Sequence, residues 1–110
     1  MELNEYQAGA RKTAIYPGRG TIMGLMYAAL GLGESGEVQG KVKKILRDAN
    51  GVVTDETRAK IQYELGDLLW YVSAMCDELG ITMDEVARSN LIKLANRAAL
   101  GRIQGSGDNR

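Results

Sequence analysis

The sequence predicts an all-α fold, arranged as a single four-helix bundle-like domain. Three observations support it: apolar residues recur at helical spacing, capping signals and glycines mark where these segments begin and end, and no stretch alternates as a strand does. At 110 residues the chain suffices for one compact domain, but small domains often gain burial from a partner subunit. We assign residues 1–104 to this domain and residues 105–110 to a polar tail.

The first two helices are predicted from one capping pair and one long uninterrupted segment. Asn4 and Gln7 have the spacing of a capping signal, so we expect a short helix over residues 4–13. Residues 21–47 contain no proline and are expected to form one long helix. Gly31, Gly33 and Gly36 lie close together in its middle. Each costs about 0.5–1 kcal/mol relative to alanine in a helix, so we expect a helix or a ligand to approach the backbone there.

The third and fourth helices have clearer end signals. Thr54 precedes acidic residues and an apolar periodic segment, which predicts a third helix that stops at Gly80. Residues 82–85 form a capping box and begin a fourth helix that continues to about Gly101. Cys76 is the single cysteine and lies among core-type residues of the third helix, so we interpret it as structural.

Composition excludes several classes of function. The 14 basic and 14 acidic residues balance, so no overall field attracts a nucleic acid polymer or an anionic membrane. No apolar stretch approaches membrane-spanning length and no signal peptide is apparent, so we expect a cytoplasmic protein. The absence of histidine leaves carboxylates, hydroxyls or a metal for catalysis.

Two pairs of acidic residues are the main candidates for a site. Glu34 and Glu37 are three residues apart on the second predicted helix, as are Glu64 and Asp67 on the third. Residues at this spacing share a helix face, and neighbouring antiparallel helices can turn both pairs toward one point. Four converging carboxylates suit a hard ion such as Mg²⁺ or Mn²⁺. Surface acids are the alternative, but the glycines beside both pairs favour a metal site.

A polar row on the fourth predicted helix is a candidate for phosphate binding. Asn90, Lys93 and Arg97 lie at positions i, i+3 and i+7, where they can bind phosphate oxygens or form a solvated face. Lys41 and Lys44, near the end of the second helix, are weaker candidates because the helix dipole alone explains cations there.

Three segments together resemble one known family. Residues 31–37, 64–71 and 90–97 resemble the MazG-like family of all-α NTP pyrophosphatases, whose pattern is Glu-x-x-Glu, a spacer and then Glu-x-x-Asp. The resemblance extends from about Ala28 to Arg97, and the combination is more specific than any single motif. It implies a homodimer or homotetramer in which helices of two subunits pack together.

The resemblance also implies residue roles. Mg²⁺, for which Mn²⁺ can substitute, would be bound by Glu34, Glu37, Glu64 and Asp67. The phosphates would be contacted by Asn90, Lys93 and Arg97. The ion would activate a water that cuts a (d)NTP into (d)NMP and pyrophosphate, with Glu37 as the expected base and Glu64 also catalytic. Arg110, at the end of the tail, is expected to fold over the nucleotide, although a flexible tail is the favoured alternative.

Other functions stay open at this point. A related all-α pyrophosphatase acting on dUTP or phosphoribosyl-ATP would keep similar acids, and a non-catalytic helical dimer would use the same fold as a binding or scaffold module. A di-iron carboxylate bundle is excluded because it needs histidines. The preferred base and sugar, the number of metal ions and the physiological role (pool cleansing, precursor supply or alarmone control) do not follow from the sequence.

Overall fold

The computed structural model describes residues 1–101, which are helical with short connections and contain no strand. The helices in chain order are α1 (Leu3–Arg11), α2 (Ile22–Gly31), the 3₁₀ helix η1 (Leu32–Glu34), α3 (Ser35–Asp48), α4 (Asp55–Leu79) and α5 (Met83–Ala99). The predicted all-α class is confirmed. No helix among these residues is both long and apolar enough to cross a membrane.

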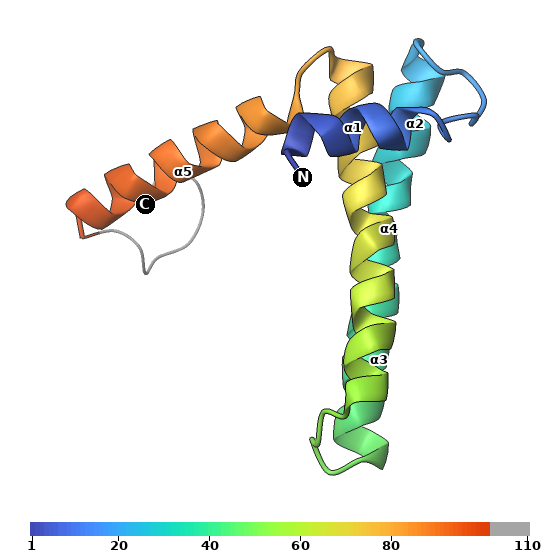
Figure 1. Ribbon diagram of the computed structural model, residues 1–110, viewed down its shortest axis with the longest axis vertical. Helices are drawn as coiled ribbons and strands as arrows, with labels where there is room; N and C mark the ends of the chain where they lie inside the picture. The colour runs from blue at the N-terminus through green and yellow to red at the C-terminus, as the bar shows by residue number, and fades with distance from the viewer. Residues whose placement is uncertain (102–110) are drawn as a thin grey trace.

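The long helix α4 organises the molecule. The α2–η1–α3 segment packs along α4 and runs in the opposite direction, while α1 crosses the end of α4 where that helix stops (Figure 1). Helix α5 leaves this end and extends away, and among the described elements it contacts only α1 and α4 (Figure 1). The four-helix bundle expected from the sequence is therefore not closed within one chain.

The second predicted helix is interrupted, which corrects the expectation of one helix over residues 21–47. The backbone stays in the right-handed helical region at Gly31 (φ −62°, ψ −25°), but the following three residues tighten into η1. A Cβ on Gly31 would overlap the ring of Tyr71, so a close approach is confirmed there. At Gly33 and Gly36 an added Cβ meets no described protein atom within 4 Å, so no helix approaches them, and the ligand alternative stays a prediction there.

The predicted capping role of Asn4 and Gln7 is also wrong. Helix α1 begins after Glu2 without a side-chain cap. The side-chain oxygens of Asn4 and Gln7 instead accept hydrogen bonds from the backbone at the start of α5. A local spacing rule cannot distinguish these cases, because the true partners lie 76 and 80 residues away in the sequence.

The remaining helix ends agree with their local signals. Thr54 caps α4 by accepting a hydrogen bond from the backbone of Thr57 at 3.2 Å. Gly80 ends α4 in the left-handed region, with φ 68°, a conformation that glycine adopts without strain. The capping box of Thr82 and Glu85 begins α5 as predicted.

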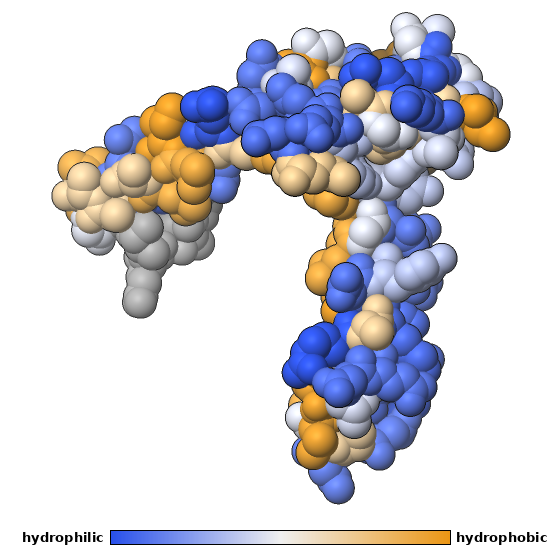
Figure 2. Space-filling view, viewed as in Figure 1, coloured by the Kyte–Doolittle hydropathy of each residue, from blue (hydrophilic) through white to orange (hydrophobic). Residues whose placement is uncertain are grey.

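The core is small for the amount of apolar surface in the chain. Ala14, Tyr16, Ala28 and Ala74 are buried together with Trp70 and Met75 packed against them. Cys76 is also buried, in agreement with its predicted structural place. Hydrophobic residues remain on the surface of α5 and along the edge of α4 that faces it (Figure 2). Leu91 and Ile92 on α5 keep 66% and 63% of their surface exposed.

Candidate functional site

An acidic pocket lies where η1 meets the middle of α4. It has a volume of about 440 Å³ and is lined by Thr13, Glu34, Asp67, Trp70 and Tyr71. Glu34 is the last residue of η1, whereas the other carboxylate and both aromatic rings come from one face of α4 at i, i+3 and i+4 spacing. The pocket thus joins one acid from each predicted pair.

Packing holds the aromatic wall of this acidic pocket in place. The Trp70 indole donates a hydrogen bond to the Thr13 hydroxyl at 2.8 Å. The rings of Trp70 and Tyr71 meet nearly at right angles, with centroids 5.1 Å apart. Tyr71 also lies against Gly31, where no side chain intervenes. Thr13 and Trp70 were not predicted from the sequence to belong to the site, although Trp70 lies three residues after Asp67, a spacing that places both on one helix face.

The carboxylates of the acidic pocket contribute to raised pKa values of two neighbouring tyrosines. Burial raises the pKa of Tyr71, and the charges of Tyr27, Glu34 and Asp67 raise it further. Burial likewise raises the pKa of Tyr6, with a smaller contribution from Asp67. Both phenols therefore stay protonated at neutral pH, and the negative field of the acidic pocket extends over its aromatic side.

Glu64 lies beside a lysine and does not line the acidic pocket. Its Oε1 lies 3.8 Å from Nζ of Lys41 on α3, and only 18% of its side chain is exposed. Lys41 follows Glu37 by one helical turn, so it brings a positive charge to the edge of the acid set. This contact gives Lys41 a role beside a carboxylate, while its phosphate contact stays a prediction.

The structure brings the four predicted metal ligands onto neighbouring elements but does not gather them at one point. Glu34 and Asp67 line one pocket, Glu64 pairs with Lys41, and Glu37 is exposed on α3. Within residues 1–101, no three acidic or cysteine side chains lie close enough to form a metal-binding group. The donor set is nevertheless all carboxylate oxygen, which fits Mg²⁺, so the metal site stays a prediction.

The predicted phosphate-binding row lies on another part of the molecule. Asn90 and Lys93 are exposed on α5, while Arg97 is buried. Because α5 makes no contact with α2, η1 or α3, the row does not reach the acidic pocket of its own chain. Lys44 lines a separate surface pocket with Lys41 and Lys60. The predicted role of Arg110 lies outside the described residues.

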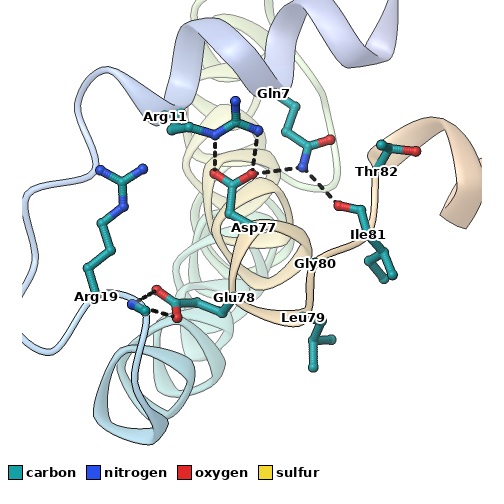
Figure 3. A pocket seen from close by; sticks show the side chains of 10 residues that line it. Gln7, Arg11, Arg19, Asp77, Glu78, Leu79, Gly80, Ile81 and Thr82 are labelled. Atoms are coloured by element: carbon teal, nitrogen blue, oxygen red, sulfur yellow. Dashed lines mark hydrogen bonds and ion pairs between the residues drawn. The ribbon is translucent and has the colours of Figure 1, made fainter.

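A second, larger pocket lies where α1, the end of α4 and the start of α5 meet (Figure 3). It has a volume of about 740 Å³, and its charged side chains are largely paired with one another. Arg11 bonds to Asp77 with Nη2–Oδ1 at 2.7 Å, and Glu78 accepts bonds from Tyr16 and from the backbone of Gly20. Sequence analysis did not single out these residues, because their partners are distant in the sequence.

Comparison with known proteins gives one family and one relative. Residues 25–99 match the model of the MazG nucleotide pyrophosphohydrolase domain. The chain is 51% identical over 114 residues to "Gene 37 protein" of Mycobacterium phage L5, and the match covers all of both chains. The comparison with solved structures finds no match.

Proposed function

Because the chain belongs to the MazG nucleotide pyrophosphohydrolase family, we propose that it hydrolyses a nucleoside triphosphate to a monophosphate and pyrophosphate with Mg²⁺. The acidic pocket between η1 and α4 carries this proposal. It combines two carboxylates, Glu34 and Asp67, with an indole and a phenol that present ring surface to a flat base. A metal-bound triphosphate would complement the two carboxylates, and its base would complement the two rings.

The four carboxylates have distinct proposed roles. Glu34, Glu64 and Asp67 chiefly hold the ion, and Glu37 accepts the proton of the attacking water. When bound, Mg²⁺ neutralises phosphate charge and lowers the pKa of that water. Glu37 suits the role of base because its exposed side chain lies one turn from Glu34, and because the chain contains no histidine. Lys41 limits the repulsion within the set by pairing with Glu64.

We further propose a homodimer or homotetramer in which α5 of one chain serves the acidic pocket of another. Within one chain, α5 points away from the acidic pocket and exposes Leu91 and Ile92 (Figure 1). An apolar face of this kind is typical of a subunit interface. The cationic side chains Lys93 and Arg97 have the charge needed beside triphosphate oxygens at an acidic metal site.

The test is hydrolysis in ¹⁸O-labelled water of a panel of NTPs and dNTPs, with dUTP and phosphoribosyl-ATP included. We expect Mg²⁺-dependent release of pyrophosphate, abolished by a chelator, and the product that carries ¹⁸O identifies the phosphorus that water attacks. Release of single phosphate without pyrophosphate would contradict the proposed reaction. If no nucleotide is turned over, the non-catalytic helical dimer becomes the better account.

A further inference from the structure

We propose that Gln7, together with Asn4, is a positioning residue that sets the direction in which α5 leaves the rest of the chain. The two side chains on α1 bond directly to the first turn of α5. Their functional consequence rests on the proposed function, because α5 carries the row of Asn90, Lys93 and Arg97. Their structural effect can be tested without it.

Gln7 is the centre of this arrangement. Only 3% of its surface is exposed, and its amide makes three hydrogen bonds. Nε2 donates to Asp77 Oδ1 at 2.9 Å and to the Ile81 carbonyl at 3.0 Å, as Figure 3 shows. Oε1 accepts from the backbone N–H of Met83 at 2.7 Å. One side chain therefore joins the last turn of α4, the connection and the first residue of α5.

Asn4 adds a second attachment one helical turn earlier on α1. Its Oδ1 accepts from the backbone N–H of Asp84 at 3.1 Å. Met83 and Asp84 are the first residues of α5, where backbone N–H groups have no partner within the helix. One bond would leave a pivot, whereas two bonds from neighbouring positions on α1 restrict the rotation of α5 about that point.

Within residues 1–101, α5 makes few other contacts with the rest of the fold. Among the described elements it touches only α1 and α4, and most of its side chains are exposed. The connection from α4 is short and includes Gly80 in the left-handed region. The direction of the helix therefore depends strongly on the attachments at its first turn.

Asp77 keeps the Gln7 amide in the required orientation. Burial alone would raise the pKa of Asp77, but hydrogen bonds from Arg11 and Gln7 and the nearby arginine charges outweigh this and lower the pKa. The carboxylate is therefore ionised at neutral pH and accepts from Nε2. With Nε2 held in this way, Oε1 is left to face Met83.

The direct test is a distance measurement between spin labels at Arg58→Cys on α4 and Ala95→Cys on α5, both exposed positions. A Cys76→Ala background leaves no other thiol, and an excess of unlabelled chain isolates distances within one molecule. We expect a narrow distance distribution in the parent, and a broader or shifted one after Gln7→Ala or Asn4→Ala. Asn4→Asp keeps an acceptor for Asp84 N–H and should restore the parent distribution.

Arg88→Ala is the matched control. It breaks the 2.6 Å pair between Arg88 and Asp84 at the start of α5 but leaves both bonds from α1 intact, so its distribution should match the parent. An unchanged distribution in Gln7→Ala would overturn the proposal. If Gln7→Ala fails to fold, the Asn4→Ala and Asn4→Asp pair decides the question alone.

Kinetics test the functional consequence. In Asn4→Ala and Gln7→Ala we expect KM for the nucleotide to rise roughly three- to tenfold, with a smaller change in kcat, since a lost hydrogen bond misplaces groups that bind phosphate. An altered distance distribution with unchanged KM would refute the positioning role. If the parent turns over no nucleotide, the proposed function fails. The distance measurement still tests whether the bonds from Gln7 and Asn4 set the direction of α5.

Discussion

The stem, formed by α2, η1, α3 and α4, and the arm, formed by α5, differ in how much of their surface packs against the rest of the same chain. In the stem, helices pack along each other and bring acids of α4 close to Glu34 and Lys41. The arm leaves Leu91 and Ile92 exposed, and among the elements of residues 1–101 it contacts only α1 and α4. The acidic half of the proposed site thus lies on the stem, and its cationic half lies on the arm, for which we propose a partner subunit.

The largest expected effect comes from removing one stem carboxylate. Glu64→Gln replaces a proposed metal-binding carboxylate with a neutral amide, and we expect kcat/KM for nucleotide hydrolysis to fall by about 100-fold or more. Steady-state pyrophosphate release measures it. Glu56→Gln is the matched control, since Glu56 lies in the first turn of the same helix and pairs with Lys60 at the surface. Equal activity of the two variants would remove Glu64 from the site.

A charge on the apolar face of the arm tests its need for a partner. Leu91→Glu places a carboxylate where we expect a subunit contact, and we expect the dissociation constant of the oligomer to rise at least about tenfold. Analytical ultracentrifugation measures it. Ser89→Glu adds the same charge to the same helix without removing apolar surface. A parent chain that is monomeric at high concentration would contradict the proposed assembly.

Within the stem, two glycines test the packing that holds the aromatic wall. Gly31→Ala forces a methyl group into the ring of Tyr71, and we expect a loss of about 1–3 kcal/mol in the free energy of unfolding. Gly40→Ala lies inside α3 with nothing within 4 Å of the new Cβ, so it should gain about 0.5–1 kcal/mol. Denaturant titration compares them. Equal stability of the two variants would show that Tyr71 adjusts freely.

The smallest expected effect is a pH dependence at the junction of stem and arm. The pKa of Asp77 is lowered in the folded chain from its usual 3.8, so this carboxylate stabilises the fold above about pH 4, and the contribution is lost as pH falls through the lowered pKa. Asp77→Asn should lose roughly 1 kcal/mol in the free energy of unfolding at pH 7, and its stability should fall less steeply than that of the parent as the pH is lowered. An equally steep fall in Asp77→Asn would disprove this assignment.

The ends of the helices were easier to predict from the sequence than the direction of the arm, for a physical reason. The ends of α4 and the start of α5 depend on residues within a few positions, so Thr54, Gly80 and Thr82 were identified correctly. Asn4 and Gln7 were misassigned because side-chain acceptors serve any nearby backbone donor, including a distant one. The direction of α5 depends on those same long-range bonds and has no local signature.

In the candidate site, too, some features followed from local spacing in the sequence and others depended on long-range packing. Helical spacing correctly placed Asp67 and Glu34 on facing elements, because packing of adjacent helices follows from their faces. Spacing could not predict that Glu64 turns toward Lys41, since the position of a long side chain depends on its surroundings. Nor could it predict that the row containing Lys93 lies beyond reach of its own acidic pocket.

Mixing two inactive variants tests the central claim most directly. A Glu64→Gln chain keeps an intact arm, and a Lys93→Ala chain keeps an intact acidic pocket. If the arm serves the pocket of another chain, subunits exchanged at equal ratio in dimers should recover about a quarter of parent activity, because half of the dimers then contain one complete site. If activity stays at the level of the separate variants after verified exchange, each chain must complete its own site, and the account is contradicted.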